Sequence, residues 1–192
     1  TRLAHSRAAV EVHEPLDMQN LGICQERWVL LPGIARTRYA ALVEKQAEML
    51  AAAEASIYNK VEKGQGTLGI IACGIAYNYV KEALGDGANV LKVSQYPLPE
   101  EAIRQLASEN SSVIVMEDGQ PVVEQQVKAL LGAGYDVKGR LTGDLPRTGE
   151  LTPDNVAKAL GAGEKEIMAP SEVVAPRPPQ LCQGCGHRDV YT

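Results

Sequence analysis

The chain has 192 residues and a mass of 20.6 kDa, with 45% hydrophobic residues and a formal net charge of −5. This length and apolar content suffice for one domain with its own core, plus shorter appended segments. The acidic balance, without a local cluster of Lys and Arg, disfavours nucleic acid as a partner. The longest apolar run, residues 68–77, is too short to span a bilayer, and the N-terminus lacks a signal-peptide pattern. We therefore expect a cytoplasmic protein without a membrane partner.

The four cysteines, at positions 24, 73, 182 and 185, stand in a chain without export signals. That context favours thiol or metal chemistry over a disulfide framework. The chain also begins at Thr1 without a methionine, and it ends just after a cysteine motif. We expect it to be an internal piece of a longer polypeptide.

Residues 1–33 have mixed composition and contain a Pro-Gly turn signal, which is typical of a linker. Residues 34–66 are predicted to be a long helix followed by a connection. Within residues 36–55, Tyr39, Leu42 and Val43 recur at helical spacing with Leu50, and charged residues fall on other faces. The pattern predicts an amphipathic helix.

Residues 67–161 alternate between short apolar runs and amphipathic segments. The runs predict strands at residues 67–74, 89–96, 112–118 and 135–141. The segments between and after them predict helices at residues 74–85, 98–108, 121–132 and 152–161. This alternation predicts an α/β domain, a three-layer α/β/α unit with a mostly parallel sheet. Because such strands are covered on both faces, we expect seven residues to be buried: Ile70, Ile71, Val90, Leu91, Val113, Ile114 and Val115.

Helix ends in this body have recognisable signals. Gly85 is a predicted C-cap, and Glu100 and Glu101 stand where the positive end of a helix dipole favours acids. Thr152 followed by Pro153 predicts an N-cap and a first helical position. These caps place the helix boundaries.

Polar motifs in the body have mostly structural interpretations. The Gly-Asp-Gly around Asp86, with Asn110 further along the chain, superficially matches the metal-diphosphate motif of thiamine enzymes. It follows a helix and not a strand, so a turn is favoured. Glu117 and Asp118 suit an acid–base pair or helix capping, and we favour capping. Cys73 is interpreted as a small semi-buried side chain.

Residues 162–180 are rich in proline and charge without periodicity, which is typical of an interdomain linker. They lead to Cys182 and Cys185, spaced as in Cys-x-x-Cys metal and redox motifs. Two such thiolates supply half of the ligands of a zinc site or of a four-iron four-sulfur cluster, or they form a complete dithiol redox site. An inert surface pair is a fourth alternative.

Five segments together resemble one family. They are "TRLAHSR", "GIIACGIAYNYVKEALG", "VSQYPLPEEAI", "GELTPDNVAKALG" and "RPPQLCQGCGHR". Their order and spacing resemble the middle of the alpha subunit of indolepyruvate ferredoxin oxidoreductase, one of the thiamine-dependent 2-oxoacid:ferredoxin oxidoreductases. The resemblance covers nearly the whole chain.

The resemblance implies a domain order. Residues 1–33 would hold the end of a pyrimidine-binding domain and a linker, and residues 67–161 would be like the C-terminal domain of transketolases. Residues 181–192 would begin a thiamine diphosphate-binding domain. The glutamate that activates thiamine would lie upstream and the true diphosphate motif downstream.

The resemblance also implies activity, cofactors and partners. The enzyme would oxidatively decarboxylate arylpyruvates to aryl-acyl-CoA and pass electrons to ferredoxin. It would use thiamine diphosphate, Mg and iron-sulfur clusters, with a beta subunit, ferredoxin, coenzyme A and the 2-oxoacid as partners. For the piece alone we expect no bound cofactor and no activity.

Two residue roles follow from the resemblance. Arg2 matches an arginine that binds the substrate carboxylate, and Cys182 and Cys185 match two ligands of a cluster near thiamine. Two alternatives stay open at this point: a noncatalytic α/β interaction domain of another 2-oxoacid:ferredoxin oxidoreductase, or a small zinc-binding module.

Overall fold

The computed structural model describes residues 14, 15, 17, 22, 24, 28–163, 171–173, 181, 184 and 186–191. Its elements, in chain order, are α1 (Pro32–Glu54), β1 (Lys60–Glu62), β2 (Leu68–Cys73), α2 (Ala76–Leu84), β3 (Asn89–Val93), α3 (Glu100–Glu109), β4 (Ser112–Met116), α4 (Val122–Leu131), β5 (Val137–Lys138), α5 (Pro153–Ala159) and α6 (Arg188–Tyr191). No helix within these described residues has the length and apolarity that a membrane crossing requires.

The five strands form one mixed sheet in the order β1-β3-β2-β4-β5. Strands β3, β2, β4 and β5 are parallel, and β1 is an antiparallel edge strand on β3. Ile70 of β2 lies level with Val90 of β3 and with Ile114 of β4. The next residue, Ile71, lies level with Leu91 and Val115 in the same way. Successive side chains of a strand point to opposite faces, so each strand contributes to two cores.

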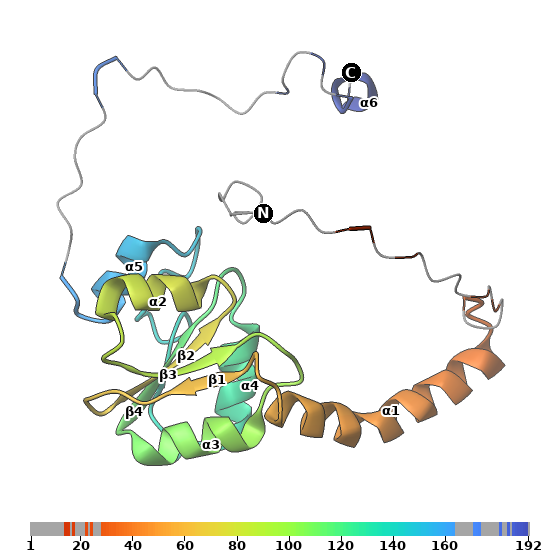
Figure 1. Cartoon of the computed structure of the whole chain (residues 1–192), viewed down its shortest axis with the longest axis horizontal. Coiled ribbons are helices and arrows are strands. Elements are labelled where there is room, and N and C mark those ends of the chain that lie inside the picture. The colour runs from red at the N-terminus through yellow and green to blue at the C-terminus, as the bar shows by residue number, and fades with distance from the viewer. Residues whose placement is uncertain are drawn as a thin grey trace.

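Helices cover both faces of this sheet (Figure 1). The helices α3 and α4 pack on the face of Ile71, Leu91 and Val115, while α2 and α5 pack on the other face. All seven predicted core residues are at most 2% exposed: Ile70, Ile71, Val90, Leu91, Val113, Ile114 and Val115. The predicted three-layer α/β/α fold with a mostly parallel sheet is therefore confirmed.

The predicted caps are also present. The Thr152 side chain accepts a hydrogen bond from the Asn155 backbone N–H at 3.1 Å, with Pro153 at the start of α5. Gly85 ends α2 with a φ of 62°, a left-handed conformation that glycine adopts without a steric penalty. Glu100 and Glu101 occupy the first turn of α3.

Strand β1 was not predicted from the sequence, because its residues lie in the segment that was interpreted as a connection. It is short and polar, and side chains hold it in place. The Glu62 carboxylate accepts hydrogen bonds from the Tyr77 hydroxyl at 2.6 Å and from Lys81 Nζ at 2.8 Å, both on α2. Asn59, just before β1, accepts bonds from two backbone N–H groups that follow β3. We propose that the folding unit begins near residue 53, so that it includes β1.

The predicted long helix corresponds to α1, whose C-terminal end is fixed to the body. Ala53 is fully buried, and the Glu54 carboxylate accepts a hydrogen bond from the Glu101 backbone N–H at 2.8 Å. The rest of α1 extends away from the α/β body (Figure 1). Its apolar side chains at Tyr39, Leu42 and Val43 are exposed, although an amphipathic pattern ordinarily indicates burial against a core.

Candidate functional site

The sheet has a point where its winding reverses. From β2 the chain crosses to β3 on one side, and from β3 it returns past β2 to β4 on the other. In parallel sheets of this kind, ligands bind outside the carboxyl ends of the two strands that flank the reversal. Here Cys73 is the last residue of β2 and is followed by Gly74, and Glu117 and Asp118 follow β4. A ligand-binding or catalytic site in this domain is therefore expected at this edge.

Glu117 is only 5% exposed and caps α4. Its two carboxylate oxygens accept hydrogen bonds from the backbone N–H groups of Val123 and Glu124, at 2.9 and 2.8 Å. A carboxylate at this position accepts hydrogen bonds from amides that have no partner within the helix. Its negative charge also interacts favourably with the positive end of the helix dipole. The capping interpretation of Glu117 is confirmed. The N-terminus of α4, which in this geometry suits a phosphate group, already holds a protein anion.

Asp118 plays a different part, and the prediction that it caps a helix start was wrong. Its Oδ1 atom accepts hydrogen bonds from the backbone N–H groups of Gly119 and Leu151, both at 2.9 Å, and lies 3.4 Å from Arg140 Nη2. Because Gly119 and Leu151 are far apart in sequence, the carboxylate ties the strand end to the segment before α5. Sequence spacing does not reveal such a long-range contact.

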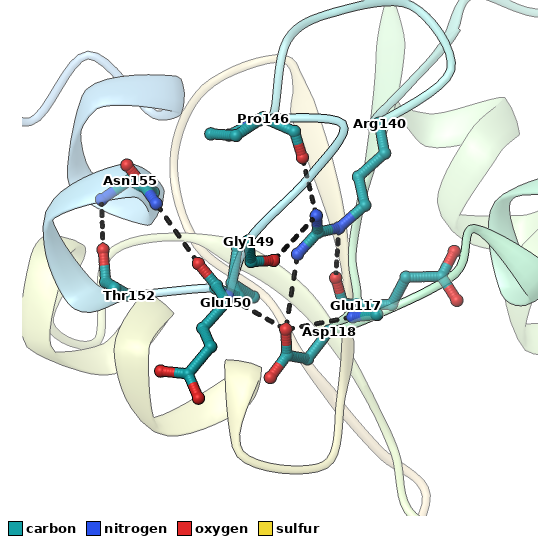
Figure 2. A network of polar contacts seen from close by, with 10 residues as sticks. Glu117, Asp118, Arg140, Pro146, Gly149, Glu150, Thr152 and Asn155 are labelled. Carbon is teal, nitrogen blue, oxygen red and sulfur yellow. Dashed lines mark hydrogen bonds and ion pairs between the residues drawn. The ribbon is translucent and has the colours of Figure 1, made fainter. Parts of the chain in front are cut away.

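Arg140 lies at the centre of this network (Figure 2). The side chain is almost wholly buried, and its Nε donates to the Glu117 carbonyl at 3.0 Å while Nη1 donates to the Pro146 carbonyl at 2.6 Å. A further contact reaches the Gly149 carbonyl at 3.5 Å. Five donors in a rigid fork suit this task of joining several carbonyls and one carboxylate. The guanidinium therefore fastens the loop after β5 to the end of β4.

Glu124 supports the same loop from α4. It is fully buried, and its Oε2 accepts a hydrogen bond from the Leu141 backbone N–H at 2.9 Å, while Lys128 Nζ lies 3.3 Å from Oε1. A Cβ atom at position 139 would lie 2.5 Å from Glu124 Oε2, so only glycine fits beside this carboxylate. The roles of Arg140 and Glu124 could not be predicted from the sequence, because no local pattern distinguishes a buried charge from an exposed one.

Cys73 is not an activated thiol. Burial, the largest cause, and the nearby Glu117 charge together raise its pKa to about 12, against the opposing effect of the hydrogen bond with Tyr96. The side chain is therefore a protonated thiol at neutral pH, and only a thiolate is a good nucleophile or metal ligand. This agrees with its interpretation as a small semi-buried side chain.

The Gly-Asp-Gly around Asp86 is a turn, as predicted. The Asp86 side chain is 97% exposed, follows the C-terminus of α2 and pairs with Lys81. Asn110, the other part of the apparent thiamine motif, donates to the Leu106 carbonyl and accepts from Asn89. Both side chains thus have partners within the domain.

The carboxyl edge also has an open hollow of about 540 Å³, lined by Gly119, Gln120, Arg147, Thr148 and Gly149. Its single charged side chain, Arg147, donates to the Gln120 side chain at 3.1 Å. Among the described residues there is also no group of three or more His, Cys, Asp or Glu side chains placed to hold a metal ion. The described edge thus has neither an acid–base pair nor a metal centre, and its charged groups serve to hold the domain together.

Comparison with known proteins gives a consistent family. The chain is 36% identical over its whole length to indolepyruvate oxidoreductase subunit IorA of Methanothermobacter thermautotrophicus, and 37% identical over 97% of its length to IorA of Archaeoglobus fulgidus. IorA of Pyrococcus abyssi is 32% identical over 86% of the chain. The chain is a homologue of a segment of IorA. The resemblance stated from the sequence is therefore confirmed.

The chain spans only about a third of these relatives, 34% of the first IorA and 33% of the second. No protein-family model matches it, and no solved structure matches it. The residues that the IorA resemblance singles out, Arg2, Cys182 and Cys185, lie outside the described residues. Their roles remain predictions.

Proposed function

We propose that this chain is part of the alpha subunit of an indolepyruvate ferredoxin oxidoreductase, a cytoplasmic enzyme that converts arylpyruvates to aryl-acyl-CoA with ferredoxin as electron acceptor. The observation that supports it most is the similarity to IorA along the entire chain. The partners would be a beta subunit, ferredoxin, coenzyme A and the 2-oxoacid. Thiamine diphosphate with Mg would stabilise the carbanion formed on decarboxylation, and iron-sulfur clusters would carry the electrons.

Within that enzyme, we assign residues 67–161 a structural role as a domain like the C-terminal domain of transketolases. The carboxyl edge of the sheet supports this assignment, because Glu117, Asp118, Arg140 and Glu124 all bond to the domain itself. Such groups are committed to stability and are not free to bind substrate. The isolated chain should therefore bind no thiamine diphosphate. Calorimetry that found tight binding, abolished by Asp86→Ala, would contradict the assignment of that motif to a turn.

Arg2 is assigned to the substrate carboxylate, which its planar guanidinium suits as a bidentate donor. The complete subunit and its beta partner should reduce ferredoxin with indolepyruvate and coenzyme A under anaerobic conditions. Losing a charge-assisted hydrogen bond costs about 1.5–3 kcal/mol, so Arg2→Ala should raise KM for indolepyruvate roughly 10- to 150-fold. Arg7→Ala serves as the matched control. A preparation that oxidises pyruvate faster than indolepyruvate would refute the arylpyruvate assignment.

Cys182 and Cys185 are assigned as two thiolate ligands of an iron-sulfur cluster near thiamine. In the complete enzyme, Cys182→Ala and Cys185→Ala should each lose the iron of one cluster and its low-temperature EPR signal. Cys24→Ala, which removes a thiol elsewhere in the chain, should retain both. Unchanged iron in all three variants would remove the cluster role, and zinc in place of iron would favour the zinc-binding alternative.

A further inference from the structure

Helix α1 has small apolar residues on all its sides, but most of its large apolar side chains lie on one side, and the two halves of this stripe differ in environment. With about 3.6 residues per turn, positions 39, 42, 43, 50 and 53 lie on one side of the helix. At the C-terminal end Ala53 is buried and Leu50 is half-buried, but Tyr39 is 70%, Leu42 51% and Val43 52% exposed. We call Tyr39, Leu42 and Val43 the outer stripe. It continues an apolar surface that is already an interface nearer the body.

Further exposed apolar side chains precede the outer stripe in the sequence. The apolar run just before α1 is also exposed, with Trp28 at 77% and Leu30 at 88%. Large apolar side chains that lie together on a surface mark an interaction site more often than single ones do. In addition, a helix segment without tertiary packing is marginally stable in water. Both arguments indicate that another protein surface covers the outer stripe.

The charges beside the outer stripe indicate what kind of surface this is. Arg36 lies on one flank, and Arg38 and Lys45 lie on the other, whereas Glu44 and Glu48 fall on the opposite side of the helix. The rim of the stripe is therefore basic. If two copies of α1 packed stripe to stripe, their basic rims would face each other, and juxtaposed like charges are unfavourable. A second copy is thus a poor occupant, and an apolar surface with an acidic rim is a good one.

We propose that the outer stripe of α1 packs against an apolar, acid-rimmed surface elsewhere in the same subunit. The relatives supply the polypeptide for it, since this chain spans only 34% of the first IorA. A segment tethered in the same polypeptide has a high effective concentration, on the order of millimolar for short linkers, so a modest apolar contact is sufficient. This inference rests on the proposed function only in that the chain is part of a longer subunit.

The test compares backbone hydrogen exchange of residues 34–47 in the complete subunit and in this 192-residue chain. In the complete subunit these amides should exchange at least about tenfold more slowly. Leu42→Glu should abolish that difference, and Arg38→Glu should reduce it. Ala41→Glu, which adds the same charge on the back of the helix at an exposed position, is the matched control and should leave the difference intact. Because Leu42 is exposed, its replacement should not change the melting temperature of the 192-residue chain.

Three results would overturn the proposal. Equally fast exchange in both proteins would show that nothing covers the stripe. Protection that appears in the 192-residue chain and rises with its concentration, with a dimer in light scattering, would identify a second copy as the occupant. Protection that appears only when the beta subunit is added would place the occupant on another polypeptide. Activity is measured on the same preparations: a complete subunit with protected α1 but no indolepyruvate turnover would refute the proposed function and still support this inference.

Discussion

Replacing Arg140 by alanine tests whether the carboxyl edge is held by its polar network. The substitution removes two short hydrogen bonds from a charged donor, at 3.0 Å to the Glu117 carbonyl and at 2.6 Å to the Pro146 carbonyl. Each such bond contributes about 1.5–3 kcal/mol, and both carbonyls lose a partner at a buried site. Asp118 contributes little to the total, because its side chain is 39% exposed and keeps two backbone N–H donors. The expected loss in free energy of unfolding is therefore about 3–6 kcal/mol.

Urea unfolding monitored by circular dichroism measures this loss. Arg147→Ala, the same change on the same loop but at an exposed position, should cost less than about 0.5 kcal/mol. If Arg140→Ala does not fold, Arg140→Lys provides the measurement, since one ammonium group replaces only part of the fork. A loss below about 1 kcal/mol for Arg140→Ala would refute the view that this guanidinium fastens the loop.

Four further predictions concern the described domain. Ile114→Ala should cost about 2–5 kcal/mol by opening a cavity in the central sheet, and a loss of a few tenths would place Ile114 at the surface. Hydrogen bonds from Lys60, Lys81 and Tyr77 lower the pKa of Glu62 from its usual 4.5 to about 2, so its contribution is complete above 4.5 and is lost as the pH falls toward 2. Between pH 4.5 and 2, the free energy of unfolding should therefore fall less for Glu62→Gln than for the wild type. Parallel pH profiles of the two proteins would contradict this. A Cβ at Gly64 would lie 2.3 Å from the Gly87 carbonyl oxygen, so Gly64→Ala should cost about 1–3 kcal/mol, whereas Gly134→Ala, with open space around it, should cost little. Glu117→Ala should cost about 1–2 kcal/mol through the lost cap, and sulfate should restore part of that stability by binding the freed N–H groups of α4; no sulfate effect would argue against an anion site there.

The sheet and its helices could be predicted because their signals are local. Strands covered on both faces must be short apolar runs, as residues 68–73 and 112–116 are, and the glycine and threonine caps mark where helices stop and start. Strand β1 lacks these signals. It has three residues, two of them charged, and its position depends on the contacts of Glu62 with α2, which are distant in sequence. Tertiary contacts therefore decide its conformation.

The candidate edge was harder to predict than the fold. Glu117 could be recognised as a cap because it stands shortly before a helix, but Asp118 beside it has the same local setting and a different role. The difference lies in the direction of each side chain: Glu117 faces the N–H groups of α4, and Asp118 faces the backbone before α5. Arg140 belongs to the same network from 22 residues away. Such pairings become apparent only once the chain has folded.

The position of this network bears on where the chemistry of the longer subunit lies. In a doubly wound sheet, the carboxyl edge at the reversal of winding offers helix amides and converging loops to a ligand. In this domain Glu117 occupies the amides of α4, and Arg140 and Asp118 join the loops to the strand end. A ligand that used the amides of α4 or entered between the joined loops would have to displace a buried carboxylate or leave carbonyls unpaired, each at a cost of about 1–3 kcal/mol. Only the open hollow beside Gly119 and Arg147 is free of that cost among the described parts of this edge. Such an edge agrees with the proposed function, in which this domain holds a fixed shape while other parts of the subunit bind substrate and cofactor. Among the described segments, α1 is the one that we propose contacts another part of the subunit, through the outer stripe and its basic rim.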